Sequence, residues 1–217
     1  MTGQISKLDQ LLARNATWAA ARLDRDPGYF RNLAQGQAPS YFWIGCSDSR
    51  VPENVVGGLD PGEIFVHRNV ANLVHSTDFN LLSALEFAIE VLGIREVIIC
   101  GHTGCGGVAA AMQGLVNGLA DHWLEAVRRL ARRNEQALLD YPEGPARNDR
   151  LAELSVIDAV ARLSETPVIR RAWARGDTVS IHGLIYRLSE GVLHNLDVTV
   201  TGAHLDREGP AAQGAGT

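Results

Sequence analysis

Short apolar runs alternate along this chain with longer stretches whose apolar residues recur at helical spacing. The runs over 41–44 and 96–100 are rich in β-branched and aromatic residues, so they predict buried strands. A short strand over 64–67 and two late strands over 178–188 and 192–200 complete this set. The remaining periodic stretches predict helices over residues 5–23, 78–92, 106–113, 120–139, 149–164 and 167–174, and a short helix that starts at Asp26-Pro27.

The alternation of strands and helices predicts an α/β fold with a mainly parallel central β-sheet flanked by helices. The segment Ser189-Glu190-Gly191 between the two late strands is a hairpin signal, so we expect an antiparallel edge strand. A length of 217 residues suffices for one core, and we expect a single domain over 1–207 in which residues 1–35 form an extended amino-terminal helical arm. The tail over 208–217 is expected to be disordered.

Composition and charge narrow the classes of function. Hydrophobic residues make up 46% of the chain and charged residues 21%, which is typical of a globular protein. The net charge of −5 argues against a nucleic-acid partner, and the arginines at 128, 129, 132 and 133 are interpreted as a solvated helix face. No apolar stretch approaches the roughly 18 residues of a membrane span. Three cysteines are too few for a disulfide framework, so we expect a cytoplasmic protein without a membrane partner.

Two segments that follow predicted strands carry the candidate chemistry, Cys46-Ser47-Asp48-Ser49-Arg50 and Gly101-His102-Thr103-Gly104-Cys105-Gly106-Gly107. Neighbouring parallel strands bring the segments after their carboxyl ends side by side, so we expect Cys46, His102 and Cys105 to converge. Two thiolates and one imidazole are the ligand set of a catalytic zinc ion with an open fourth position. Cys100 lies inside a predicted strand and is interpreted as a core residue.

Asp48 and Arg50 distinguish a catalytic site from a structural one. An aspartate two residues from Cys46 can reach the metal, its bound water or the guanidinium of Arg50, which would keep the carboxylate ionised. A surface ion pair without function is the alternative. The glycines of the second segment match neither a P-loop nor a dinucleotide-binding pattern, and they suit a close approach to a small ligand. The sequence therefore predicts a zinc enzyme that catalyses hydrolysis or hydration.

The two motifs together resemble the β-class carbonic anhydrases, and in particular their bacterial, bicarbonate-regulated type II subset. The similarity runs from about Gly36 through Asp197 and includes the segments 43–46, 61–63, 65–74 and 181–183. The resemblance implies reversible hydration of carbon dioxide to bicarbonate, with one Zn2+ per chain held by Cys46, His102 and Cys105.

The same resemblance implies roles for further residues. Asp48, locked by Arg50, would accept a hydrogen bond from the attacking hydroxide and help to pass the proton onward. Substrate-binding roles would fall to Gln37 (in the cleft of the partner subunit), to a backbone N–H near Gly104 and to the apolar walls Val70 and Phe87. Phe87 departs from related bacterial sequences, which commonly have tyrosine there, and the carboxyl end is shorter than in many relatives.

Regulation and assembly are implied in the same way. Trp43, Arg68 and Tyr186 match the residues around a non-catalytic bicarbonate site, which would stabilise a closed state with Asp48 as fourth zinc ligand. The implied assembly is a homodimer, with dimers pairing into tetramers.

Two alternatives stay open. The same scaffold hydrolyses carbon disulfide or carbonyl sulfide in some relatives, and the chain could also be a non-catalytic module that binds zinc or bicarbonate.

Overall fold

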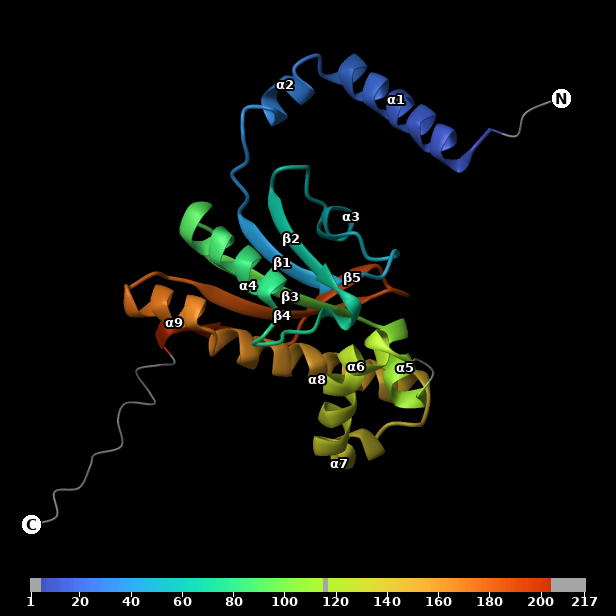
Figure 1. Ribbon diagram of the computed structural model, residues 1–217, viewed down its shortest axis with the longest axis vertical. Helices are drawn as coiled ribbons and strands as arrows, with labels where there is room; N and C mark the ends of the chain where they lie inside the picture. Colours follow the sequence, from blue (N-terminus) through green and yellow to red (C-terminus); the bar gives the residue numbers. More distant parts are fainter. Residues whose placement is uncertain (1–4, 115–116, 204–217) are drawn as a thin grey trace, which may run out of the picture. The chain divides into compact units, whose positions relative to one another are not determined.

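The computed structural model describes residues 5–114 and 117–203, so the tail over 208–217 lies outside the described residues. The chain divides into two compact units, Met1–Ala38 and Pro39–Thr217. The first unit contains α1 (Lys7–Arg25) and α2 (Tyr29–Leu33), which Figure 1 draws in blue. Neither helix buries a residue. The expected helix at 5–23 is therefore present as an exposed amphipathic helix.

The second helix starts later than Asp26-Pro27. The Asp26 carboxylate accepts a hydrogen bond from the Gly28 N–H at 2.8 Å and closes a turn after α1. Gly28 is the residue before the first helical turn, and Tyr29 begins the helix. A short acidic side chain serves a turn as well as a helix cap, which is why the pattern predicted the wrong starting residue.

The second unit is built on a six-stranded sheet in which five strands follow the order β2-β1-β3-β4-β5. Figure 1 shows these strands side by side. Their bounds are Tyr41–Cys46 (β1), Ile64–Asn69 (β2), Glu96–His102 (β3), Ser180–Arg187 (β4), Val192–Asn195 (β5) and Val200–Thr201 (β6). β1, β2, β3 and β4 pair in parallel, whereas β5 and β6 pair antiparallel with β4. The expected mainly parallel sheet with an antiparallel edge strand is confirmed.

Helices connect the strands. They are α3 (Glu53–Gly57), a 3-10 turn η1 (Val70–Asn72), α4 (Phe79–Glu86), a π-helical turn η2 (Phe87–Val91), α5 (Gly106–Gln113), α6 (Leu119–Arg133), α7 (Glu135–Leu139), α8 (Pro145–Ser164) and α9 (Pro167–Ala174). Asp78 caps α4 as expected, because its side chain accepts hydrogen bonds from the N–H groups of Asn80 and Leu81. No helix among the described residues is long and apolar enough to cross a membrane.

Several boundaries differ from the expected ones, and the strand expected over 192–200 is divided into β5 and β6. β1 and β3 extend to Cys46 and His102, so these residues end their strands instead of lying in the loops that follow. The helix expected over 120–139 is interrupted at Asn134, and the helix expected from Asp149 already begins at Pro145. Proline fits the first helical position because that position needs no donated hydrogen bond.

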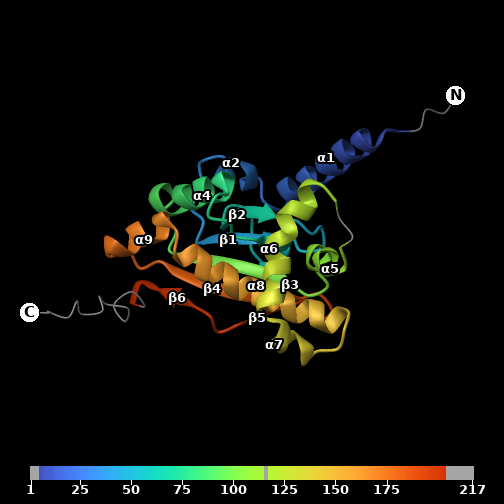
Figure 2. The ribbon, with the colours of Figure 1, turned by 60° about the horizontal axis from the view of Figure 1, so that its bottom comes forward.

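Close contact between α8 and the sheet depends on two glycines. A Cβ at Gly101 of β3 would lie 2.7 Å from Val156 Cγ2 of α8, and a Cβ at Gly183 of β4 would lie 3.1 Å from Val156 Cγ1. Since these positions carry no side chain, α8 packs directly on β3 and β4, as Figure 2 shows. Val156, Val160 and Leu163 of α8 are fully or almost fully buried in this core.

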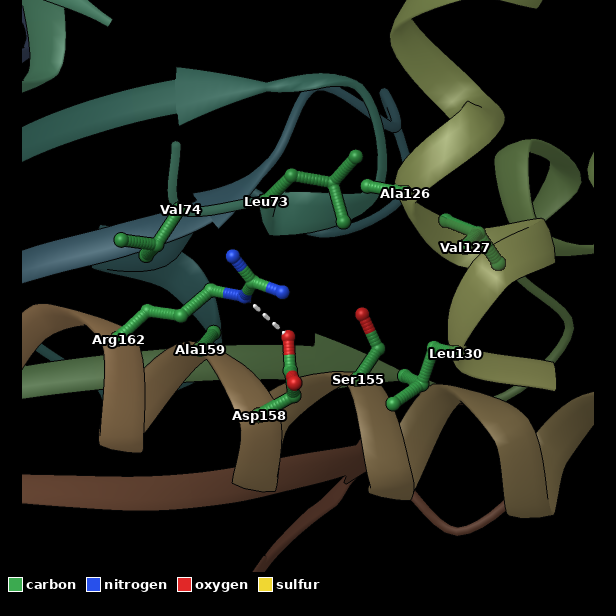
Figure 3. A pocket seen from close by; sticks show the side chains of 9 residues that line it. All are labelled: Leu73, Val74, Ala126, Val127, Leu130, Ser155, Asp158, Ala159 and Arg162. Carbon is green, nitrogen blue, oxygen red and sulfur yellow. Dashed lines mark hydrogen bonds and ion pairs between the residues drawn. The ribbon is translucent and has the colours of Figure 1, made fainter. Parts of the chain in front are cut away.

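A small cavity lies between α6, α8 and the chain at Leu73 and Val74 (Figure 3). Its volume is about 10 Å3, which is room for about one water molecule. Ser155, Asp158 and Arg162 are its polar lining residues, and Asp158 forms an ion pair with Arg162. None of the lining residues is one of the candidate site residues.

Candidate metal centre

The adjoining ends of β1 and β3 bring the two sequence motifs together. Gly45 of β1 lies opposite Cys100 of β3, so the next residues along each strand emerge at the same edge of the sheet. Cys46 is the last residue of β1, His102 is the last residue of β3, and Cys105 directly precedes α5. All three are buried, and their ligand atoms lie within 4.8 Å of one another. The structure thus brings together the three residues expected to converge.

The donor atoms suit a zinc ion. The sulfur atoms of Cys46 and Cys105 are 3.9 Å apart. His102 Nδ1 lies 3.0 Å from the carbonyl oxygen of Thr103, which can only accept, so Nδ1 carries the proton in this bond. His102 Nε2 is buried and has no hydrogen-bond partner in the part of the chain that the structure describes. A neutral imidazole then offers its lone pair at Nε2 beside two sulfurs, which is the donor set of a Cys2His zinc site.

Electrostatics favour deprotonation of one thiol. The side-chain hydrogen bond between the two thiols lowers the pKa of Cys46, against the opposing effect of burial. The same contact raises the pKa of Cys105. Burial is the largest single effect on His102 and opposes its charged form, but Cys46, the Thr103 carbonyl and Asp48 together outweigh it and raise the His102 pKa. Deprotonation of the second thiol would add uncompensated negative charge. A divalent cation bound to both sulfurs would compensate this charge.

Asp48 is held beside this cluster by Arg50. Its Oδ1 accepts from Arg50 Nε at 2.9 Å and its Oδ2 accepts from Arg50 Nη2 at 2.7 Å. These two bonds hold the pKa of Asp48 well below its usual range. Asp48 Oδ2 also lies 3.8 Å from His102 Nε2. The carboxylate is therefore ionised and paired with Arg50.

Both polar backbone atoms of Gly104 are engaged within the chain. Its N–H donates to Asp149 Oδ1 at 2.7 Å. Its carbonyl oxygen accepts a hydrogen bond from Arg50 Nη2 at 3.0 Å. A backbone N–H near Gly104 that donates to a substrate oxygen stays a prediction, and the N–H of Gly104 itself already has a partner. The φ of 63° at Gly104 lies in the left-handed region that favours glycine.

The residues expected to line the substrate cleft are found in three places. Val70 is 44% exposed and lies against the start of α5, because a Cβ at Gly107 would be 3.0 Å from Val70 Cγ1. Phe87 is 43% exposed and its ring stacks on Phe65 with the centroids 5.8 Å apart. Gln37 is an exposed residue of the first unit. Val70 alone of these is placed by the described contacts next to the metal-ligand motif.

Trp43, Arg68 and Tyr186 lie on three strands of the same sheet. Trp43 of β1 is buried, and Tyr186 of β4 packs in the same hydrophobic cluster. Trp43 Nε1 is buried and has no hydrogen-bond partner among the described residues. Arg68 of β2 donates to the backbone carbonyl of Cys46 at 2.8 Å. The strand that carries Cys46 thus holds a buried donor at Trp43, and its last residue is bonded to the guanidinium of Arg68.

Glu53 is an acid of this region that the sequence did not single out. Its Oε1 lies 2.9 Å from Arg68 Nε, and the residue is 5% exposed. Burial raises the pKa of its carboxyl. A Cβ at Gly45 would lie 2.8 Å from both Glu53 Oε1 and Trp43 Nε1, so the two groups meet over Gly45. Glu53 follows Pro52 as an ordinary helix-start residue, and no local pattern indicates its burial or its pairing.

Comparisons with known proteins agree with this geometry. The family described as carbonic anhydrase matches residues 41–193. The carbonic anhydrase of Emericella nidulans is 37% identical over 198 residues, which cover 91% of this chain and 87% of that protein. The carbonic anhydrase of Saccharomyces cerevisiae is 35% identical over 199 residues, 88% of this chain and 89% of that one.

Solved structures give the same result. A β-carbonic anhydrase of Aspergillus fumigatus superposes with a TM-score of 0.85 at 39% identity, covering 93% of this chain and 96% of that chain. A tetrameric β-carbonic anhydrase of Sordaria macrospora has a TM-score of 0.84 at 36% identity, with coverage of 89% and 98%.

Proposed function

This chain belongs to the β-class carbonic anhydrases, enzymes that catalyse the reversible hydration of carbon dioxide to bicarbonate, and we propose that one zinc ion on Cys46, His102 and Cys105 supports the reaction. The observation that carries the proposal is the cluster of three buried ligand atoms within 4.8 Å of one another. When bound there, zinc supplies the Lewis acidity that makes hydroxide available from water near neutral pH.

Asp48 and Arg50 direct the proton of the nucleophile. The carboxylate of Asp48 accepts the hydrogen bond from the attacking hydroxyl group and fixes the direction of its lone pair. Because Arg50 holds the pKa of Asp48 well below its usual range, Asp48 orients the proton and passes it on instead of retaining it. The His102 ring is held by its Nδ1–H bond to Thr103, and Val70 provides an apolar wall for a nonpolar gas.

The experiment that tests the substrate compares carbon dioxide with its sulfur analogues. Stopped-flow measurements on the zinc-loaded chain are expected to show rapid hydration of carbon dioxide and little release of sulfide from carbon disulfide or carbonyl sulfide. Cys105→Ser is the control that should lose both zinc and activity. Faster sulfide release would favour the hydrolase alternative, and a zinc-loaded chain without turnover at any pH would favour a non-catalytic module.

We further propose that Trp43, Arg68 and Tyr186 form a non-catalytic bicarbonate site of the type II kind. The unpartnered buried N–H of Trp43 supports this, because a bound anion would satisfy it. Glu53 already pairs with Arg68, so bicarbonate must share or displace that carboxylate. Bicarbonate there would stabilise a closed state in which Asp48 leaves Arg50, and an effector shifts such a balance only by its differential affinity.

Trp43→Phe tests the regulatory site, since it keeps an aromatic ring and removes the N–H. Added bicarbonate is expected to inhibit the unmodified enzyme beyond product competition and to inhibit Trp43→Phe or Tyr186→Phe less. Trp173→Phe is the matched control, because Trp173 Nε1 donates to the Val179 carbonyl away from these residues. Equal inhibition of all variants would contradict the site.

We propose a homodimer as the minimal active species, with dimers able to pair into tetramers. The tetrameric relative of Sordaria macrospora supports this, as do the exposed apolar residues Leu8, Leu11 and Leu12 of α1, which suit a protein surface. Sedimentation velocity should give a dimer or a tetramer that carries the activity. A fully active monomer would contradict the proposal.

We also propose a cytoplasmic location. Cys46 and Cys105 must remain reduced to hold zinc, and their sulfurs are close enough that oxidation competes with metal binding. Cell fractionation should recover the enzyme with cytoplasmic markers, and recovery from an oxidising compartment would contradict this.

A further inference from the structure

The peptide unit between Thr103 and Gly104 is bonded at both of its polar ends. Its carbonyl oxygen lies 3.0 Å from His102 Nδ1, and its N–H donates to Asp149 Oδ1 at 2.7 Å. Since a peptide unit is planar and rigid, the Asp149 carboxylate and the His102 ring are fixed relative to each other through it. A carboxylate that accepts from the N–H also polarises the carbonyl toward His102.

The next peptide unit connects Asp149 to the other half of the site. The Gly104 carbonyl accepts from Arg50 Nη2 at 3.0 Å, and the same nitrogen donates to Asp48 Oδ2 at 2.7 Å. The φ of 63° at Gly104 turns the chain so that its N–H and its carbonyl serve different partners. Asp149 therefore anchors Gly104. The carbonyl oxygen of Gly104 bonds to Arg50, and the carbonyl oxygen of the preceding Thr103 bonds to His102.

α8 gives Asp149 a rigid support. Ala152 is 4% exposed and Val156 is fully buried, and both lie against Gly101, where a Cβ would be 3.6 Å from the Ala152 carbonyl oxygen. Ala152 is one helical turn beyond Asp149. The helix that carries Asp149 is thus fixed on β3 next to His102.

On the basis of the proposed zinc-dependent function, we propose that Asp149 is a positioning residue of the reaction, which holds the Thr103–Gly104 peptide and through it orients both His102 and Arg50. Partners of metal ligands act in this way: they fix the ring orientation and the tautomer, and their loss typically costs about 10- to 100-fold in metal affinity or activity. Asp149 touches neither the metal ligands nor the reacting atoms directly.

The test compares Asp149→Ala and Asp149→Asn with Asp158→Ala. Asp158 is the matched control because it lies on the same helix and pairs with Arg133 and Arg162 instead. The zinc dissociation constant of each zinc-free variant is measured by competition with a chelator, and kcat and KM for carbon dioxide are measured across pH. Thermal unfolding of each variant monitors the fold.

Asp149→Ala is expected to weaken zinc binding and lower kcat, each by about 10-fold or more, with KM close to that of the unmodified enzyme. Asp149→Asn should recover part of the zinc affinity and part of kcat, because its amide oxygen still accepts a hydrogen bond from the Gly104 N–H. Asp158→Ala should leave zinc affinity and kcat unchanged. If Asp149→Ala does not fold, the zinc affinity and kcat of Asp149→Asn decide, and values equal to those of Asp158→Ala overturn the proposal.

The outcomes separate this inference from the proposed function. An unmodified enzyme that binds zinc and hydrates carbon dioxide, together with an Asp149→Ala variant equal to the control, overturns the role of Asp149 alone. An unmodified chain that binds no zinc overturns both.

Discussion

The Asp48 carboxylate lies between the guanidinium of Arg50 and the metal ligand His102. The Arg50 side chain donates two hydrogen bonds to this carboxylate, and the Arg50 backbone N–H donates a third at 3.0 Å. This geometry leaves the carboxylate ionised and turned to a fixed angle beside His102. Asp48 and Arg50 therefore act as one unit, because neither has the same orientation without the other.

Removal of either member should cost about as much as removal of both. Asp48→Asn and Arg50→Ala are each expected to lower kcat by roughly 100-fold or more, the usual size of an acid-base contribution. Steady-state kinetics of the two single variants and the double variant give the coupling energy. Strictly additive losses would contradict the interpretation of a unit.

Residues within one short motif were predictable, whereas partners far apart along the chain were not. Cys46, Asp48 and Arg50 stand together in the sequence, so their contacts follow from spacing. The bond from the Gly104 N–H to Asp149 joins residues 45 positions apart and depends on where α8 lies. No local pattern carries that information, so the sequence did not show that the Gly104 N–H already has a partner within the chain.

At the scale of elements, α8 packs closely on the sheet because glycines occupy the strand positions that face it. A Cβ at Gly183 would lie 2.5 Å from Val198 Cγ2 and 3.1 Å from Val156 Cγ1, too close for atoms of short, branched side chains. Gly106, by contrast, has open space where a Cβ would stand. The two positions thus differ in the space available for a Cβ, and they lie in β4 and at the start of α5.

Gly183→Ala is expected to destabilise the fold by about 1–3 kcal/mol, the usual cost of overpacking a core. Gly106→Ala should change the free energy of unfolding by less than about 0.5 kcal/mol. Denaturant unfolding of the zinc-free variants measures both. Equal values for the two variants would show that α8 does not depend on this close contact.

The surface of α6 has an electrostatic cluster around Glu125. Arg128, Arg132 and Arg129 all donate to its carboxylate, the closest at 2.7 Å, and they lower the pKa of Glu125 to about 2. Three of the four arginines expected on this helix face are therefore paired with acids of their own helix, and Arg133 pairs with Asp158 of α8. A carboxyl whose pKa is lowered on folding stabilises the fold above its unfolded pKa, near 4.3, and this contribution disappears as the pH falls toward about 2.

Glu125→Gln should lower the unfolding temperature at about pH 6, and this difference should shrink as the pH falls from about 4 to about 2. Glu165→Gln is the control, because the Glu165 side chain forms no ion pair among the described residues. Thermal unfolding of the three proteins at each pH gives the comparison. If Glu125→Gln lowers the unfolding temperature by the same amount at every pH down to 2, this would be inconsistent with the low pKa of Glu125.

Element types followed from periodicity more closely than element ends did. The apolar runs predicted β1 and β3, but Cys46 and His102 continue their strands because neighbouring strands supply ladder partners. The helix break at Asn134 and the start of α8 at Pro145 are local features, and a proline at the first helical position marks the second. Spacing of apolar residues contains little of that information.

At the scale of the whole molecule, the strand order produces the site. β1 and β3 are adjacent although β2 lies between them in sequence, so two motifs far apart in the chain end at one edge. The alternation of strands and helices predicted this parallel arrangement. The division into units at Ala38 and Pro39, close to the expected end of the arm at residue 35, leaves the complete ligand set within the second unit.

A titration of the zinc-free enzyme with zinc, followed by stopped-flow hydration of carbon dioxide, tests the central claim most directly. Activity should rise in proportion to added zinc and reach its plateau at one equivalent per chain, because Cys46, His102 and Cys105 provide one site. Full activity before zinc is added, or a plateau at a different stoichiometry, would contradict the account.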